Sequence, residues 1–410
     1  MKMANMDDYF DVVIVGTGAA GLYCALNLPA RYRILLLAKQ KADESDSFLA
    51  QGGICMQHGE ADYRPFFDDT MRAGHYENNP ATVDLMIRSS NSIIRDLVRR
   101  GVRFARDDHG ALRFTREGAH SRPRILFHED ITGHEITQTL LNEVLRCENI
   151  ELREHTTLLD FFADASACGG VIAAGPDGEP RAIGAGAVVL ACGGIGGLYK
   201  NSTNFPHITG DAIAMALRHG VACKHLDYIQ IHPTTLYSHR KGRRFLISES
   251  VRGEGALLLD KNGNRFTNEL QPRDVVSAAI RAQMEKDSTD HVWEDMRPIG
   301  EAAIREHFPN ILERCEEEGY DPIHEPIPVV PAQHYFMGGI TADLSSRTAL
   351  PRLYACGETC CNGVHGRNRL ASNSLLESLV FAQRAADDIL SGEPPVFTGD
   401  KPDLAPYREQ

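Results

Sequence analysis

The sequence lacks the features that mark several specialised classes of protein. No apolar segment is long and uninterrupted enough to cross a membrane, and no apolar signal-peptide core lies near the N-terminus. The ten cysteines form no C-x-x-C pair, which argues against a metal site and a disulfide framework. A net charge of −13 argues against nucleic acid and anionic membrane surfaces as partners. These absences favour a cytoplasmic protein, and 410 residues are enough for several structural units.

The strongest local signal is a glycine-rich turn near the N-terminus. Four β-prone residues, Val12 to Val15, are followed by three glycines in the G-x-G-x-x-G spacing: Gly16, Gly18 and Gly21. This spacing predicts a tight turn, a close approach of a diphosphate to the backbone, and close packing of the next helix on the sheet. A helix from Ala19 to about Leu28 and a strand over residues 34–37 would complete a βαβ unit. We expect a dinucleotide at the N-terminus of this helix; a glycine turn without a ligand is the alternative.

Two later segments repeat the pattern of a strand followed by glycine. They are Val188–Leu190 before Gly193, and Leu353–Ala355 before Gly357. Because the carboxyl ends of parallel strands share one edge of a sheet, the three turns are expected to converge on one ligand. Lys39 lies where NAD-binding units usually carry an acid, so FAD fits better than a nicotinamide cofactor.

The stretch between the last two strands is rich in charge, proline and histidine and predicts an inserted domain. We therefore expect an α/β fold, in which a Rossmann-like FAD-binding domain carries an inserted α+β capping domain. The expected FAD-binding parts are residues 1–225 and 336–395, the capping domain is 226–335, and 396–410 form a tail.

The insertion and its borders contain an unusual set of polar residues: His232, Ser248, Glu249, Arg252, Arg273, His334 and Arg369. Arginine offers paired planar donors that match a carboxylate, so a cavity lined by this set would suit a small dianion. Taken singly, each histidine or arginine is explained better by a structural or surface role, and only the set with its flanking motifs favours a binding site. Glu117 would either accept the ammonium group of a 2-amino dicarboxylate or pair with Arg116 or Arg122 on a loop.

At these motifs the sequence resembles the L-aspartate oxidase family, part of the superfamily of succinate dehydrogenase and fumarate reductase flavoprotein subunits. The resemblance runs from about Asp11 to Leu390. Its most specific segments are residues 50–54, 117–125, 232–234, 252–255, 272–274 and 371–377. The helical C-terminal domain that this family normally carries has no counterpart in the sequence.

The resemblance implies non-covalent FAD and assigns residues by position. The implied flavin contacts are Gly16, Thr17, Gly18, Ala19, Ala20, Gly21, Lys39, Ser47, Gln51, Gly52, Gly53, Asp211, Glu358, Ser374 and Leu375. The implied substrate contacts are His232, Ser248, Glu249, His334 and Arg369. Arg273 would transfer a proton, and Glu117 would face the amino group, as the catalytic pair.

The implied activity is oxidation of L-aspartate to iminoaspartate in quinolinate and NAD synthesis, with oxygen or fumarate as electron acceptor and a functional link to quinolinate synthase. A soluble fumarate reductase or succinate dehydrogenase-type flavoprotein and a non-catalytic flavin-binding protein are the alternatives. Asp46 stands where succinate dehydrogenases carry their flavin-linked histidine, which argues against a covalent flavin. Arg367 replaces an alanine of the family pattern and would either alter substrate preference or point outward.

Overall fold

The structure of the chain is a computed structural model that describes residues 8–164, 166–240, 242–392, 394, 396–397 and 399–408. Residues 1–7 of the first predicted segment and 409–410 of the predicted tail lie outside the described residues.

A seven-stranded sheet in the order β6-β2-β1-β9-β8-β7, with β16 beside β9, forms the centre of the fold. Its parallel strands are β1 (Asp8–Val15), β2 (Ile34–Leu37), β6 (Ile150–Arg153), β9 (Pro180–Leu190) and β16 (Leu353–Ala355). Two further strands, β7 (Thr157–Ala163) and β8 (Cys168–Ala174), form an antiparallel meander with β9. The predicted βαβ unit is confirmed, and the three strands that end in glycine turns are neighbours, as the sequence indicated.

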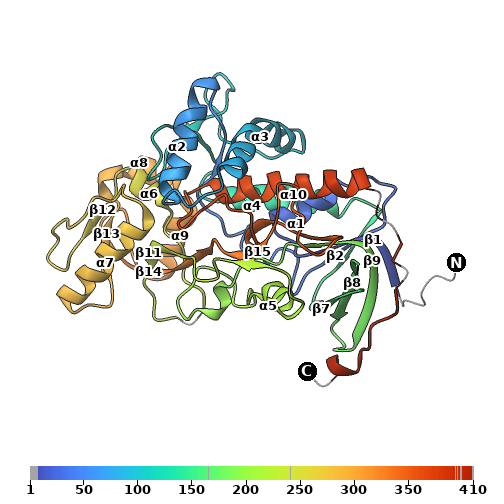
Figure 1. Cartoon of the computed structure of the whole chain (residues 1–410). Helices are drawn as coiled ribbons and strands as arrows, with labels where there is room; N and C mark the ends of the chain where they lie inside the picture. Colours follow the sequence, from blue (N-terminus) through green and yellow to red (C-terminus); the bar gives the residue numbers. More distant parts are fainter. Residues whose placement is uncertain are drawn as a thin grey trace.

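Both faces of the central sheet are covered, because β1 points alternate apolar side chains to opposite sides. Val12 and Ile14 pack into one core cluster, and Val13 and Val15 pack into another. The first cluster is covered by a layer of helices: α1 (Ala19–Leu26), α3 (Pro80–Arg99), α4 (Thr132–Val144) and α10 (Asn373–Gly392). Figure 1 shows α10 running beside α1 and α4 across the sheet.

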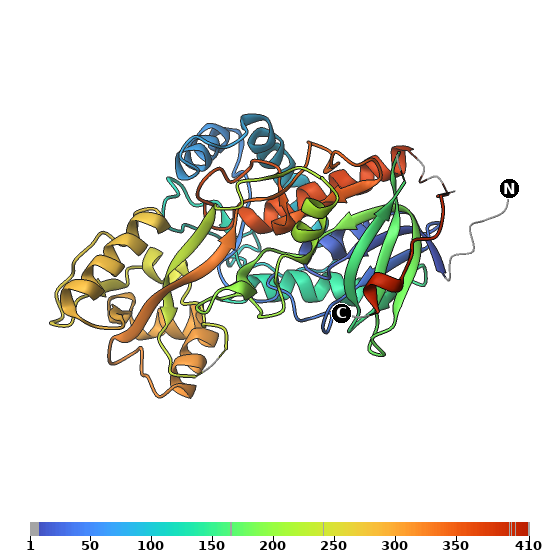
Figure 2. The same ribbon diagram turned by 60° about the horizontal axis from the view of Figure 1, so that its bottom comes forward.

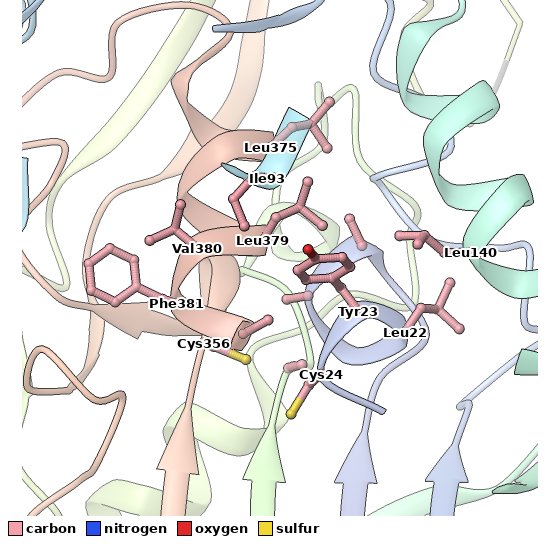
Figure 3. Packing of buried hydrophobic residues seen from close by; sticks show 14 of the residues in the cluster. Leu22, Tyr23, Cys24, Ile93, Leu140, Cys356, Leu375, Leu379, Val380 and Phe381 are labelled. Atoms are coloured by element: carbon pink, nitrogen blue, oxygen red, sulfur yellow. The ribbon is translucent and has the colours of Figure 1, made fainter. Parts of the chain in front are cut away.

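Helix α1 is held in place by large buried side chains on three neighbouring helices. Tyr23 of α1 lies among Leu379 of α10, Ile93 of α3 and Leu140 of α4 (Figure 3). Each fully buried aliphatic side chain contributes about 1.5–3 kcal/mol relative to an exposed one. This packing fixes the N-terminus of α1, and with it the glycine turn.

Helix α5 (Asp211–Arg218) and a small sheet cover the other face. The small sheet comprises β10 (Cys223–Lys224), β15 (Gly339–Thr341) and β17 (Cys360–Cys361). Helix α2 (Tyr63–Ala73) packs on α3, near a third sheet of β3 (Ile54–Cys55), β4 (Phe114–Thr115) and β5 (Ile125–Leu126). Short 3-10 turns lie at Glu60–Asp62, Gly196–Leu198, Arg297–Ile299, Gly357–Thr359 and Ala405–Tyr407.

Most of the predicted insertion forms a lobe at one end of the molecule, drawn in yellow and orange in Figures 1 and 2. Its antiparallel sheet has the order β11-β14-β13-β12, with β11 (Ile229–Leu236), β14 (Ile327–Phe336), β13 (Val292–Asp295) and β12 (Leu257–Leu259). Its helices are α6 (Glu249–Gly253), α7 (Arg273–Asp287), α8 (Glu301–His307) and α9 (Pro309–Glu317). The domain boundaries stay a prediction.

One carboxylate ties this lobe to the segment before α4. The Asp130 side chain accepts hydrogen bonds from the backbone N–H of Ile311 at 2.8 Å and from the Asn310 amide at 2.6 Å. These donors belong to the first turn of α9, whose free N–H groups attract a negative charge. Asp130 is buried and lies in the wall of the main cavity.

The described part of the predicted tail packs on the meander. Phe397 is buried against Phe162, Ile172 and Ala182, and the hydroxyl of Tyr407 donates to Asp160 at 3.0 Å. The segment has few apolar residues, but this one ring supplies a specific anchor. No helix within the described ranges is both long and apolar enough to cross a membrane.

Candidate functional site

The main cavity, of about 400 Å³, opens at the carboxyl ends of β1, β9 and β16. From the predicted flavin set its wall contains Gly16, Thr17, Gly18, Ala19, Ala20, Lys39, Ser47, Gln51, Gly52, Gly53, Asp211, Glu358, Ser374 and Leu375. From the predicted substrate and catalytic sets it contains Glu117, Ser248, Glu249, Arg273, His334 and Arg369. Residues from across the chain thus meet around one space.

The glycine turn forms one end of the cavity. Gly16 has a φ of +113°, and a Cβ there would lie 2.0 Å from the carbonyl oxygen of Ala191. A Cβ on Gly21 would lie 1.9 Å from the carbonyl oxygen of Gly16, so Gly21 serves helix packing and is not part of the cavity wall. The Ser47 hydroxyl accepts a hydrogen bond from the Ala19 N–H at 3.0 Å. The close packing at the two glycines fixes the turn at the N-terminus of α1, where backbone N–H groups suit an anion.

Lys39 and Asp211 form an ion pair beside this turn. The Lys39 ammonium lies 2.6 Å from the Asp211 carboxylate, and it also donates to the backbone carbonyl of His207 at 3.0 Å. The pair links the end of β2 to the start of α5. Hydroxyl and amine groups of a nucleoside would find both a donor and an acceptor here.

A buried oxygen atom in the wall favours a bound group with N–H or O–H donors. The side-chain oxygen of Gln51 has no hydrogen-bond partner within the described part of the chain. Buried polar groups are nearly always satisfied, so this atom fits a dinucleotide with hydroxyls and ring N–H groups. Nearby, Glu358 accepts a hydrogen bond from the backbone N–H of Phe336 at 2.9 Å, and burial raises the pKa of its carboxyl to about 8.

The far end of the cavity contains two arginines that come from different segments. Arg273, at the start of α7, donates from Nε to Glu249 at 2.5 Å and from a terminal nitrogen to Gln230 at 2.9 Å. Although burial raises the pKa of Glu249, Arg273 and then Arg252 hold that pKa below its ordinary value. Glu249 is therefore ionised and holds the Arg273 guanidinium in place.

Arg369 supplies the second guanidinium. It stacks over the ring of Tyr335 at 4.6 Å and donates to the Ser374 hydroxyl at 3.0 Å. Burial and then the nearby charge of Arg273 lower the pKa of Arg369 to about 10, so it stays charged at neutral pH. Its Nε has no acceptor among the residues described, which leaves a donor for an anion.

The two predicted histidines lie together but differ in access. Their rings are 5.1 Å apart, and only His334 lies in the cavity wall. His334 is fixed by the Thr203 hydroxyl, 2.7 Å from its Nδ1, while His232 is fully buried behind it. Burial, followed by the charge of Arg273, lowers the pKa of both rings well below the ordinary value. Both are neutral hydrogen-bonding groups at neutral pH.

Glu117 is a buried acid, and the partners of its carboxylate within the described residues are serines rather than Arg116 or Arg122. Its two oxygens accept from the hydroxyl of Ser250 at 2.9 Å and from that of Ser372 at 2.6 Å. Burial and then the charge of Glu249 raise the pKa of its carboxyl. Because a nearby cation favours the ionised form, an incoming ammonium group would relieve this perturbation.

Four other residues that shape the site were not identified from the sequence: Gln230, Ser250, Ser372 and Asn368. Two of them lie beside predicted residues, Ser250 after Glu249 and Asn368 before Arg369, but nothing in their type signals a role. Arg252, which belonged to the predicted cation set, is buried outside the cavity wall and donates to the backbone carbonyl of Glu269 at 2.6 Å.

Comparison with known proteins decides the family. The model of the FAD binding domain family matches residues 11–375. The L-aspartate oxidase of Clostridium perfringens is 48% identical over 382 residues, which cover 93% of this chain and 87% of that protein. The enzyme of Clostridium acetobutylicum is 47% identical, with 92% and 87% covered. The chain belongs to the L-aspartate oxidase family.

A solved quinol fumarate reductase of E. coli has the same fold as this member of the family. The two share 32% identity with a TM-score of 0.89, over 98% of this chain and 72% of that one. The predicted family, α/β fold and FAD cofactor are thus confirmed. The ligand contacts of individual residues stay predictions.

Two departures from the family pattern can now be placed. Asp46 lies in the cavity wall and accepts from the backbone N–H of Phe205 at 2.9 Å, while burial raises its pKa to about 7. Arg367 points outward: it is 66% exposed and lies 3.9 Å from Glu77, away from the cavity wall. Of the two interpretations of Arg367, the outward one holds.

Proposed function

We propose that this protein oxidises L-aspartate to iminoaspartate with non-covalently bound FAD. The observation that carries the proposal is the mixed charge of the substrate end: Arg273 and Arg369 share a cavity wall with the buried acid Glu117. L-Aspartate carries two carboxylates and one ammonium group, which is the complementary set. Membership of the L-aspartate oxidase family supports the same reaction.

The carboxylates are the groups that orient the substrate. Arg369 has a free buried donor, and His334 has a second ring nitrogen beside it. Paired planar donors fix both the position and the rotation of a carboxylate. In this proposal Arg369 and His334 hold the dianion and His232 supports the ring of His334 from behind, while Arg273 contacts the carboxylate nearer the reacting carbon.

The amino group must lose a proton before a hydride leaves Cα. When bound, FAD supplies the acceptor for that hydride. Glu117 receives the ammonium group, and its raised pKa makes the carboxylate a better proton acceptor than free glutamate. Arg273 lies in the same cavity wall, where its bond to Glu249 keeps the guanidinium oriented for the proton transfer assigned to it.

We include oxygen or fumarate as the electron acceptor, a role in NAD synthesis and a functional link to quinolinate synthase in this proposal. A cytoplasmic location is also part of it, because all ten thiols are free and a reducing compartment keeps them so.

Rapid mixing of the FAD-loaded protein with L-aspartate under anaerobic conditions tests the proposal. We expect the flavin to be reduced and its absorbance to bleach in a single turnover with L-aspartate, whereas succinate should only shift the spectrum of flavin that stays oxidised. Bleaching by succinate alone would replace the proposal with a dehydrogenase of dicarboxylates. A loaded protein that neither substrate bleaches would be a non-catalytic flavoprotein.

A fumarate reductase is the second candidate. The same arginines and histidines would bind fumarate or succinate, and the fold matches the E. coli quinol fumarate reductase with a TM-score of 0.89. The buried carboxylate of Glu117 favours the amino acid, because an unpaired negative charge beside a dianion would weaken its binding.

A further inference from the structure

We infer that Asn368 is a positioning residue that fixes the guanidinium groups of Arg273 and Arg369 relative to each other. The inference rests on the proposed function, since it concerns how this site binds a dicarboxylate. Asn368 is buried, lies outside the cavity wall, and belongs to the segment that directly precedes Arg369. It acts through its neighbours and touches no reacting group.

The argument begins with Gln230, whose amide can be oriented in only one way. Arg273 has donors and no acceptor, so the nitrogen 2.9 Å away must meet the side-chain oxygen of Gln230. The amide nitrogen of Gln230 then donates to the backbone carbonyl of Arg369 at 2.7 Å and to the side-chain oxygen of Asn368 at 2.8 Å. One amide therefore bridges both arginine-bearing segments.

The orientation of Gln230 in turn fixes that of Asn368. Since the Asn368 oxygen accepts, its amide nitrogen is left to donate, and two acceptors face it. These are the backbone carbonyl of Ala73 at 3.2 Å and the Asp274 carboxylate at 3.5 Å. Asp274 directly follows Arg273, and its other oxygen lies 3.0 Å from Nε2 of His75. Asn368 thus joins β11, the start of α7, the end of α2 and its own segment.

The hydrogen bonds that link Gln230, Asn368 and Asp274 form a frame around the two arginines. Such a frame is needed because the two guanidinium groups repel each other. The charge of Arg273 contributes to the lowered pKa of Arg369, after burial. Glu249 pairs with Arg273, but Arg369 has only the neutral Ser374 hydroxyl and the Tyr335 ring as side-chain partners in the described structure. Without a rigid link, repulsion would separate the groups when no dianion lies between them.

The test compares Asn368→Ala with Asn78→Ala in the FAD-loaded protein. Asn78 is similarly buried, and its amide, like that of Asn368, donates to two acceptors: the backbone carbonyls of Thr70 in α2 and of Val364 in the segment before Arg369. Within the described part of the chain, the Asn78 amide forms no hydrogen bond with Gln230, Arg273 or Arg369. The control therefore loses the tie between α2 and this segment but keeps the frame around the guanidinium groups.

Succinate binding is the readout, measured as a flavin difference spectrum together with FAD retention and Tm. We expect Asn368→Ala to weaken succinate binding by about tenfold or more, while Asn78→Ala stays within about twofold at a similar loss of Tm. Combining Asn368→Ala with Arg369→Lys should cost less than the sum of the two single losses, because both break one network. Equal affinities for the two alanine variants, or strict additivity, would overturn the inference.

A second variant covers the case in which Asn368→Ala does not fold. Asn368→Asp keeps the acceptor for Gln230, but it loses the donor to Ala73 and places a carboxylate beside Asp274. At pH 8 this variant should bind succinate more weakly than the wild type does. At pH 6 the ratio of the two affinities should be closer to one. Unchanged binding at pH 8 would count against the frame. Succinate binding does not require aspartate turnover. Wild-type protein that binds succinate but fails to oxidise aspartate would therefore refute the proposed function and leave the inference about Asn368 standing.

Discussion

Replacing Glu117 with glutamine removes the carboxylate at this position while keeping the shape of the side chain. Both partners of Glu117 are hydroxyls, from Ser250 and Ser372, and a hydroxyl can either donate or accept. The glutamine amide can therefore be satisfied by rotating one hydroxyl. Glu117→Gln thus tests the charge itself.

The expected loss follows from the contact that disappears. A hydrogen bond to a charged group contributes about 1.5–3 kcal/mol, and about 1.4 kcal/mol corresponds to a factor of ten in rate. We expect kcat/KM for L-aspartate to fall by about ten- to a hundredfold. Reduction of fumarate, which has no amino group, should change by less than about threefold.

The stability of the Glu117→Gln variant should rise although its activity falls. The raised pKa of Glu117 means that the folded protein binds its proton more tightly than the unfolded chain does. Its ionisation therefore reduces the free energy of unfolding as pH rises from the unfolded to the folded pKa. Protein without ligand should thus have a higher Tm at pH 8 in the Glu117→Gln variant, and this gain should vanish at pH 4.

The assay measures steady-state kinetics for both substrates in the wild type, in Glu117→Gln and in the control Ser250→Ala. The control removes one hydrogen bond to Glu117 but keeps the charge, so it should lose less aspartate activity than Glu117→Gln. Equal losses for aspartate and fumarate in Glu117→Gln would refute an ammonium-binding role. If Ser250→Ala lost as much aspartate activity as Glu117→Gln, the position of the Glu117 side chain, rather than its charge, would determine the activity.

Four further changes test other parts of the structure. Arg273→Leu removes the nearer cation of the buried Glu249 and leaves only Arg252 at 3.8 Å; breaking such a buried pair costs about 3–5 kcal/mol, so kcat/KM should fall at least about a hundredfold, and near-normal turnover would exclude Arg273 from the reaction. Gly16→Ala should abolish FAD retention, measured as bound flavin per protein, because its Cβ would collide with a backbone carbonyl; full occupancy would contradict this. Phe397→Ala should lower the free energy of unfolding by about 3–5 kcal/mol in urea titrations without changing KM, and no change in stability would show that the ring anchors nothing. Burial raises the pKa of Glu377 to about 7, so Glu377→Gln should raise Tm above pH 7 but not near pH 4; a gain independent of pH would refute this reason.

The fold and the cofactor end of the site were predictable because their signals are local. A buried strand, three glycines and a helix within residues 12–26 specify the turn by sterics alone. Helix α1 ends at Leu26, two residues before the predicted Leu28, because Asn27 forms the C-cap. Details of this kind depend on the last turn of a helix and are hard to read from composition.

The hydrogen bonds that hold the substrate-binding side chains in place were not predictable from the spacing of residues in the sequence. Glu117 is held by serines 133 and 255 positions away, and nothing in a serine's identity signals such a contact. The burial of Phe397 was missed for a similar reason, since a single apolar residue in a polar segment gives no periodicity. The resemblance to a family supplied the positions, and the structure supplied the hydrogen bonds between them.

The bond between Asp130 and α9 has a mechanical consequence. A helix normally carries its N-terminal cap on the residue before it, but here the carboxylate arrives from a segment about 180 positions earlier. Swinging the yellow and orange lobe outward would strip α9 of that cap, so fraying of its first turn would accompany any such opening. Amide exchange at Ile311 would therefore report lobe motion directly, without a label near the flavin.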